Sequence, residues 1–382
     1  MLSKLFSFVA IFSLTVAVQA QQVLIPAPPQ LAATAYLLVD ADTGEVLVEH
    51  NADEQLPPAS LTKMMTSYIV TNELEHNRLG EQDLVNISVK AWEMGGSKMF
   101  VREGTQVPVI DLLRGVIIQS GNDASVALAE HIAGGEDAFA DVMNQTAQLL
   151  GLHGTHYMNS TGWPAEGHLT TARDLATLAQ AIIADHPQYY PLYAEKYFEY
   201  NEINQPNRNR LLFRDSSVDG LKTGHTEAAG YCLVASAKRK QMRLISVVMG
   251  TTSENARAAE TQKLLAYGFR YYESAELYVA GSVLDTARVW YGTSDALTLT
   301  VPAAVTMTIP RGSKDNIEAS LVMPDTLKAP IAIGDELGKL TLTLNGEVIA
   351  EVPAVAAHDV DEAGFFARLI DAIKLFISNL LS

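Results

Sequence analysis

The spacing of apolar residues predicts a first unit with strands at both of its sequence ends and helices between them. In 36–49 apolar residues flank a polar turn, which predicts a β-hairpin. Between 106 and 184 apolar residues recur every three or four positions, as in amphipathic helices, and a polar loop at 151–170 interrupts them. Three strands and then a helix are predicted further on, at 218–224, 231–237, 242–249 and 254–272. The hairpin can join the late strands in one mixed sheet covered by helices, which is an α/β (α+β) fold.

The pattern changes after about residue 276. Short runs in which threonine, valine, leucine and glycine alternate fill 276–360 and predict a small all-β domain. Within it, Asn345-Gly346 is a predicted hairpin turn.

The last segment, 361–382, has apolar residues at helical spacing on one side and polar residues such as Arg368 and Lys374 on the other. It is too short and too polar to span a bilayer. One interpretation is a helix docked on the protein's own core, and the other is a helix lying in a membrane interface. Its position after a complete β domain favours the membrane interface.

The first twenty residues have the pattern of a secretory signal peptide. Lys4 precedes the apolar run 5–18, and Val18-Gln19-Ala20 offers small residues for cleavage, so the mature chain is predicted to start at Gln21. An uncleaved anchor is the alternative, but the run is short for a transmembrane helix. We therefore expect an exported protein with signal peptide 1–20 and a loose lead-in at 21–34.

Composition narrows the function classes only slightly. The 382-residue chain has a net charge of -17, so it lacks the cationic surplus that a nucleic-acid partner requires. Cys232 is the only cysteine, which excludes an intramolecular disulfide and predicts a small buried side chain on a strand.

The first candidate for chemistry lies in 57–65, PPASLTKMM, where a helix is predicted to start at Ser60 and to run to about residue 74. Ser60 stands where a cap would stand, and Lys63 shares its helix face. A lysine opposes the helix dipole there, and this opposition lowers its pKa, more so if it is buried or near another cation. A neutral amine can take the proton of a serine hydroxyl, which predicts a nucleophile and its base. Alone, Ser-x-x-Lys is a weak signal.

Two further motifs strengthen this interpretation. Ser120-Gly-Asn122 stands at a break between helical segments and offers a hydroxyl for proton relay and an amide. Lys222-Thr-Gly224 stands on a predicted strand, where Lys222 adds positive charge, Thr223 can bind a carboxylate and Gly224 lets a substrate backbone approach. Ser253-Glu-Asn255 matches the second pattern too, but it follows Lys222 and so has the wrong order.

In this order the three motifs resemble the set of penicillin-binding proteins and serine β-lactamases. From about residue 32 to the C-terminus the chain is similar to the low-molecular-mass penicillin-binding proteins, the D-alanyl-D-alanine carboxypeptidase group of penicillin-binding proteins 5 and 6. The stretches that carry this resemblance are 119–123, 207–209, 218–226, 229–231, 242–246 and 268–272. The resemblance implies a β-lactamase/transpeptidase-like peptidase domain at 35–275, a β-rich domain at 276–360 and a membrane-anchor helix at 361–382.

The same resemblance implies the chemistry. Ser60 would attack the carbonyl between the two terminal D-alanines of a peptidoglycan stem peptide, with Lys63 as the base. Ser120 and Lys222 would pass the proton to the leaving amine, and Asn122 would hold the substrate amide. It implies neither a metal nor a cofactor.

Further roles are implied around the substrate's termini. Backbone N–H groups of Ser60 and His225 would form the oxyanion hole. The terminal carboxylate would lie near Thr223, with Arg208 and Arg257 as electrostatic partners. The alternatives are an exposed helix arginine for Arg257, since 251–255 differ from the family's usual run, and a turn residue for His225.

Several functions stay open at this point. A β-lactamase of class A needs a Glu-x-x-Leu-Asn loop, and Glu166-Gly-His-Leu-Thr170 lacks the asparagine, so we expect Glu166 to be a solvated loop residue. A DD-endopeptidase and a catalytically silent penicillin-binding scaffold are compatible with the three motifs as well. The expected partners are stem peptides, β-lactams and the periplasmic face of the cytoplasmic membrane, and the sequence leaves a homodimer open.

Overall fold

The computed structural model describes residues 24–381. The predicted signal peptide, 1–20, lies outside the described residues. The chain forms two compact units, of which the first holds 26–279 and 304–311 and the second holds 280–303 and 312 onward. The domain boundaries expected from the sequence stay a prediction.

A five-stranded sheet in the order β2-β1-β9-β8-β7 forms the centre of the first unit. Its strands are β1 (Ala35–Asp40), β2 (Val46–His50), β7 (Val218–Thr226), β8 (Gly230–Arg239) and β9 (Met242–Thr251). The predicted hairpin and late strands are confirmed and share this sheet. The sheet is antiparallel throughout, which corrects the mixed arrangement expected from the sequence. Three residues connect β7 to β8, and two residues connect β8 to β9. Connections this short permit only antiparallel neighbours.

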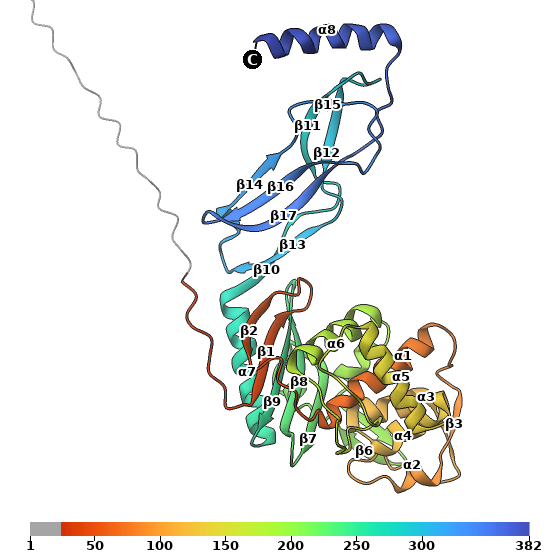
Figure 1. The fold of residues 1–382 in the computed structure, drawn as a ribbon. Helices are drawn as coiled ribbons and strands as arrows, with labels where there is room; N and C mark the ends of the chain where they lie inside the picture. Colours follow the sequence, from red (N-terminus) through yellow and green to blue (C-terminus); the bar gives the residue numbers. More distant parts are fainter. Residues whose placement is uncertain (1–23, 382) are drawn as a thin grey trace, which may run out of the picture. The chain divides into compact units, whose positions relative to one another are not determined.

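Side chains of the sheet alternate between two helical layers. Leu37 and Val247 belong to the large core shared with the helices of residues 63–185. Leu38 and Leu244 point the other way, toward α7, where a Cβ on Gly268 would lie 2.6 Å from Leu244. Figure 1 shows α7 on one face of the sheet and the other helices of this unit on the opposite face.

The helices of the first unit confirm the predicted helical middle. They are α1 (Lys63–Glu75), α2 (Val89–Glu93), α3 (Val109–Arg114), α4 (Asn122–Ala133), α5 (Glu136–Leu149), α6 (Ala172–Asp185) and α7 (Glu254–Tyr271). Three two-stranded pairs complete the unit: β3 (Leu84–Asn86) with β4 (Gln106–Pro108), β5 (Tyr197–Tyr200) with β6 (Ile203–Pro206), and β10 (Tyr272–Tyr278) with β13 (Val305–Pro310).

The second unit is built on a six-stranded sheet in the order β14-β16-β17-β12-β11-β15. Its strands are β11 (Val283–Trp290), β12 (Ala296–Thr300), β14 (Ile317–Val322), β15 (Leu327–Lys328), β16 (Glu336–Leu344) and β17 (Glu347–Ala356). Asn345 and Gly346 join β16 to β17 with φ of 55° and 84°, the positive values that a tight hairpin turn needs. The predicted turn and the β-rich C-terminal region are confirmed.

Helix α8 (Phe365–Leu381) ends the described chain. Asp371 ties it to the sheet of the second unit, because its carboxylate accepts a hydrogen bond from the backbone N–H of Tyr291 at 3.0 Å. Within 24–381, no helix combines the length and the apolar character needed to cross a membrane.

The fold brings the three sequence motifs together. Strand β7, at the edge of its sheet, contacts the 3₁₀ turn Ala59–Thr62 that precedes α1. Helix α4 packs against α1 and begins directly after Ser120-Gly121. Cys232 is fully buried on β8, as predicted.

Candidate active site

Ser60 lies in a single 3₁₀ turn, Ala59–Thr62, that leads into α1 at Lys63. It does not cap a helix, in contrast to the position expected from the sequence, because neither helix start has a side-chain cap bond. Its Oγ lies instead 3.1 Å from the Nζ of Lys63. The hydroxyl therefore faces an amine, as a nucleophile and base require.

Two glycines let neighbouring segments press against this turn. A Cβ on Gly162, which has φ of +83°, would lie 1.8 Å from the carbonyl oxygen of Ala59. A Cβ on Gly224 would lie 2.9 Å from the carbonyl oxygen of Pro58. The chain's own turn fills the space that a side chain would take, and Gly224 also lines the recess beside Ser60. The approach of a substrate backbone to Gly224 stays a prediction.

Lys63 is fully buried at the start of α1. Its Nζ contacts Ser60 Oγ, the Oδ1 of Asn122 at 2.7 Å and the carbonyl oxygen of Thr161 at 2.5 Å. Burial lowers the pKa of Lys63 to about 7, while the nearby carboxylates of Asp123 and Glu136 act in the opposite direction. A large fraction of this amine is therefore neutral near neutral pH and able to accept a proton.

A second buried lysine reaches the next motif. Ser120 has the left-handed conformation, φ 63°, at the end of a π-helical turn (Gly115–Gln119), and its Oγ accepts a hydrogen bond from Lys222 Nζ at 2.9 Å. Burial lowers the pKa of Lys222 well below its ordinary value, and the positive charge of Lys63 adds to this effect. The two lysines and two serines form a compact set of groups that can exchange protons.

The side-chain amide of Asn122 holds Lys63 in this structure. Its Oδ1 accepts from Lys63, and its Nδ2 donates to the carbonyl oxygen of Gly95 at 2.7 Å. Sequence reasoning assigned this amide to the substrate alone, whereas the structure also gives it a role in fixing the lysine.

A polar recess of about 180 Å³ adjoins Ser60. It opens beside a larger cleft of about 810 Å³, with which it shares Ser60, Ser97, Arg208 and His225. The residues that line the recess are Ser60, Ser97, Ser120, Arg208, Thr223, Gly224, His225, Tyr231, Glu254 and Arg257. Its size and polarity suit a small charged group, and the cleft suits an extended chain.

The two arginines reach the recess in different ways. Arg257 is buried on α7, donates from Nη1 to the carbonyl oxygen of Gly224 at 3.1 Å and lies over the ring of Tyr231. Arg208 is exposed and donates from Nε to Gln119 at 3.1 Å. His225 is on β7 and stacks on Tyr231, so it is not a turn residue. The alternative of an exposed Arg257 is wrong.

Comparisons with known proteins agree with this geometry. Residues 22–253 match the family described as D-alanyl-D-alanine carboxypeptidase, and residues 272–362 match the family described as penicillin-binding protein 5, C-terminal domain. The chain belongs to the D-alanyl-D-alanine carboxypeptidase family. The resemblance inferred from the three motifs is confirmed.

Relatives of this carboxypeptidase family extend over nearly the whole chain. The chain is 44% identical over 364 residues to D-alanyl-D-alanine carboxypeptidase DacA of Escherichia coli (strain K12), covering 93% of this chain and 90% of the relative. It is 41% identical to DacA of Haemophilus influenzae, covering 98% of this chain and 97% of the relative. The crystal structure of penicillin binding protein 5 from Haemophilus influenzae superposes with a TM-score of 0.83 at 42% identity, covering 88% of this chain and 100% of that chain.

Sequence reasoning on this family member missed two buried groups beside the motifs. Asp123 accepts hydrogen bonds from the backbone N–H groups of Met99, Phe100, Val101 and Ala124, so it holds the 99–101 segment against the start of α4. His168 pairs through Nε2 with Thr62 Oγ1 at 2.8 Å and accepts from the Met158 N–H at its Nδ1. Burial lowers the pKa of His168 to about 4. An acidic residue in the first turn of α4 could have indicated Asp123, whereas nothing in the loop sequence indicates His168.

Two residues set aside in the sequence have structural explanations. Ser253 caps α7, where its Oγ accepts from the Ala256 N–H at 3.0 Å, so the second Ser-x-Asn pattern is a helix cap. Glu166 is exposed in its loop, as predicted.

Proposed function

We propose that Ser60 is the nucleophile of a serine-type D-alanyl-D-alanine carboxypeptidase that removes the terminal D-alanine from peptidoglycan pentapeptide stems. One observation carries the proposal: the three motifs meet around one recess, with Lys63 Nζ 3.1 Å from Ser60 Oγ and Lys222 Nζ 2.9 Å from Ser120 Oγ. Such trimming places the enzyme in cell-wall biogenesis and the control of cell shape.

Acylation begins with the neutral amine of Lys63 taking the proton of Ser60. The Oγ then bonds to the carbonyl carbon of the penultimate D-alanine, and the carbonyl π electrons move to oxygen. Backbone N–H groups of Ser60 and His225 stabilise this oxyanion, a contribution that is worth about 3–4 kcal/mol for a single donor in other serine peptidases.

Collapse of the tetrahedral intermediate breaks the bond to the terminal D-alanine. The departing nitrogen needs a proton. Ser120 and Lys222 relay to it the proton that Lys63 accepted from Ser60. The Ser120–Lys222 hydrogen bond at 2.9 Å supports this relay. Water then hydrolyses the ester on Ser60 and releases the shortened stem peptide, which restores the serine hydroxyl.

The terminal carboxylate of the substrate occupies the polar recess. Thr223 can donate a hydrogen bond, and Arg257 and Arg208 supply positive charge from α7 and from the segment before residues 210–213. The second hydrogen of Asn122 Nδ2 donates to the substrate amide, since Gly95 uses only one hydrogen. A free C-terminal carboxylate therefore defines the substrate class.

β-Lactams are the second class of ligand that this site takes. A related crystal structure is that of a penicillin binding protein, and the strained amide of a β-lactam presents a carbonyl to Ser60 as the peptide does. Attack by Ser60 opens the β-lactam ring and forms an ester on its Oγ. The amine released by this step stays attached to the opened β-lactam.

We infer that residues 1–20 direct export and that α8 holds the mature chain at the periplasmic face of the cytoplasmic membrane. The support for the anchor is the row of large apolar side chains that α8 exposes: Phe365, Phe366, Leu369, Ile370, Ile373, Phe376, Ile377 and Leu380. The helix lies in the interface with this row buried among the lipids.

Product analysis tests the assigned reaction. The mature chain is incubated separately with a defined pentapeptide, a cross-linked muropeptide and a labelled penicillin. The proposal predicts release of D-alanine from the pentapeptide and labelling by penicillin. Cleavage of the cross-link alone would mean an endopeptidase, rapid repeated penicillin hydrolysis without D-alanine release would mean a β-lactamase, and labelling without either product would mean a silent scaffold.

A further inference from the structure

The amine of Lys63 is oriented by two acceptors. A neutral amine has two hydrogens and one lone pair. Asn122 Oδ1 at 2.7 Å and the Thr161 carbonyl oxygen at 2.5 Å can take both hydrogens, which leaves the lone pair for the Ser60 hydroxyl at 3.1 Å. The position of the Thr161 carbonyl therefore helps to decide whether the base faces the nucleophile.

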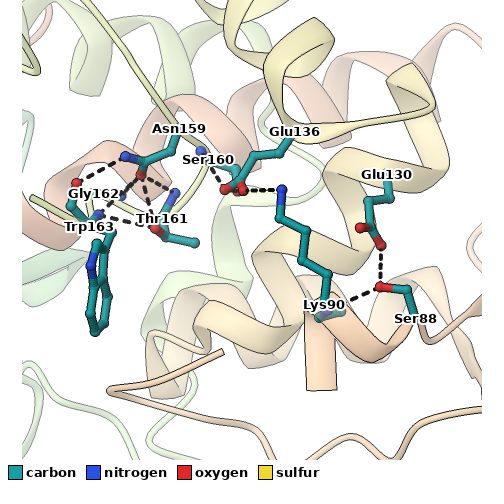
Figure 2. A network of polar contacts seen from close by, with 10 residues as sticks. Ser88, Lys90, Glu130, Glu136, Asn159, Ser160, Thr161, Gly162 and Trp163 are labelled. Atoms are coloured by element: carbon teal, nitrogen blue, oxygen red, sulfur yellow. Dashed lines mark hydrogen bonds and ion pairs between the residues drawn. The ribbon is translucent and has the colours of Figure 1, made fainter. Parts of the chain in front are cut away.

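That carbonyl belongs to a tightly bonded turn at 159–163. The Oδ1 of Asn159 accepts from the backbone N–H groups of Thr161, Gly162 and Trp163 and from the Thr161 hydroxyl. Its Nδ2 donates to the Trp163 carbonyl at 2.9 Å, as Figure 2 shows. An asparagine used in this way builds a rigid local turn, but a rigid turn still needs attachment to the helices around it.

The turn is attached to α1, the helix that carries Lys63, through two consecutive carbonyls. The Ser160 carbonyl accepts from the Thr66 hydroxyl at 2.7 Å, and the Thr161 carbonyl accepts from Lys63, one turn earlier on α1. Ser160 and Thr161 are both buried.

Glu136, the first residue of α5, attaches the turn from the other side. Its Oε1 accepts from the Ser160 hydroxyl at 2.9 Å and from the Ser160 N–H at 3.3 Å, and its Oε2 pairs with Lys90 of α2 at 2.9 Å. Figure 2 shows the carboxylate between Ser160 and Lys90. The carboxylate of Glu136 is largely shielded from solvent, whereas Lys90 is half exposed.

We propose that Glu136 is a positioning residue for the reaction. It holds Ser160 so that the Thr161 carbonyl stays on the amine of Lys63 and the lone pair of that amine faces Ser60. The proposal rests on the function proposed above for Lys63, which is that of the base.

The charge of Glu136 has a second effect on the same amine. The charged and titratable groups that act on Lys63 from the surrounding elements are Asp123 of α4, Glu136 of α5, Lys222 of β7 and His168 of the loop. Asp123 and Glu136 raise the pKa of Lys63 against the effect of burial. Loss of the Glu136 charge therefore lowers the pKa of Lys63 further.

Two substitutions separate position from charge. Glu136→Gln keeps an acceptor for Ser160 and removes the charge, so the acidic limb of the kcat/KM profile for D-alanine release moves to lower pH with little change at the plateau. Ser160→Ala keeps the charge and removes one of the two hydrogen bonds that Ser160 donates to Glu136, so the plateau falls by about tenfold while the limb stays in place, since small misplacements of reacting groups are costly.

The chain offers a matched control in Glu130 of α4. It lies beside the same Lys90, but it bonds to Ser88 Oγ at 2.6 Å and not to the turn, as Figure 2 shows. Glu130→Gln removes the same charge and is expected to move neither the limb nor the plateau.

Titration of [¹³Cε]lysine-labelled protein supplies a readout that does not depend on turnover. The Lys63 resonance of Glu136→Gln is expected to titrate at lower pH than in the wild type and in Glu130→Gln. If both Glu136→Gln and Ser160→Ala match the wild type in pH limb, plateau and Lys63 titration, the inference is overturned. If Lys63 titrates as expected but the wild type releases no D-alanine, the proposed function is what fails.

Discussion

Lys222 donates a hydrogen bond from Nζ to the Oγ of Ser120 at 2.9 Å, and this bond joins edge strand β7 to the start of α4. Both residues are buried, and the same recess reaches Ser120 and Ser60. In the proposed reaction, this pair relays the proton that Lys63 accepts to the departing amine of the substrate. The pair makes Ser120 a participant in the reaction in our account.

Removal of the Ser120 hydroxyl should interrupt this route. Ser120→Ala is expected to slow acylation of Ser60 by a labelled penicillin by a factor on the order of 10²–10⁴, the usual size of general acid–base contributions. Ser253→Ala is the matched control, because Ser253 fits the same Ser-x-Asn pattern but only caps α7. It should cost about 1 kcal/mol of stability and leave the acylation rate unchanged. Equal acylation rates for the two variants would remove Ser120 from the mechanism.

The rate of acylation should depend on the protonation of Lys63. Burial lowers the pKa of this amine to about 7, and the neutral form is the base, so kcat/KM should rise with pH through about 7 and then level off. Lys63→Arg keeps the charge and cannot be deprotonated, and should be inactive at every pH tested. A profile that is flat between pH 6 and about 8, or active Lys63→Arg protein, would contradict the role of Lys63.

Arg257 should make the enzyme require a free C-terminal carboxylate. Arg257→Gln is expected to raise KM for the pentapeptide and to reduce the preference for pentapeptide over its C-terminal amide by about tenfold or more. This factor corresponds to the free energy that one hydrogen bond to a charged group contributes. Arg210→Gln is the control for positive charge near the site, because Arg210 is exposed and does not itself line the recess, although its partner Glu254 does. If Arg210→Gln reduces the preference equally, general positive charge explains it and the recess does not.

The exposed apolar row of α8 should determine binding to lipid. Phe366→Glu and Phe376→Glu are each expected to weaken binding of the mature chain to phosphatidylethanolamine–phosphatidylglycerol vesicles by at least about tenfold. Each substitution removes an aromatic side chain that the lipids would bury. Val322→Glu and Val348→Glu change exposed valines on the sheet of the second unit and serve as controls. Sedimentation with vesicles measures the effect, and a loss that is as large in the valine variants would contradict the anchor. D-alanine release in solution should be unchanged in all four proteins.

The main elements and the three motifs could be predicted because they depend on local pattern. Apolar periodicity located the strands and helices of the first unit, and Ser60, Ser120 and Lys222 stand in motifs of a few residues each. The antiparallel sheet could have been inferred from the short connections after β7 and β8, but the sequence interpretation did not weigh them.

The groups that were missed act across long sequence separations. His168 contacts Thr62, and Glu136 holds Ser160, which in turn bonds to Thr66 on the catalytic helix. Neither side chain has a neighbour in sequence that indicates these contacts, and an acidic first residue of a helix ordinarily indicates only a favourable end charge. Gly224 was interpreted from substrate chemistry alone, because the approach of Pro58 becomes visible only after folding.

The most direct test of the account is the site of covalent attachment. The wild type and Ser60→Ala are incubated with penicillin, digested and analysed by mass spectrometry, and D-alanine release from the pentapeptide is measured in parallel. We expect the added mass on the peptide that contains Ser60 in the wild type, and neither adduct nor D-alanine release in Ser60→Ala. An adduct on another residue, or D-alanine release by Ser60→Ala at the wild-type rate, would contradict it.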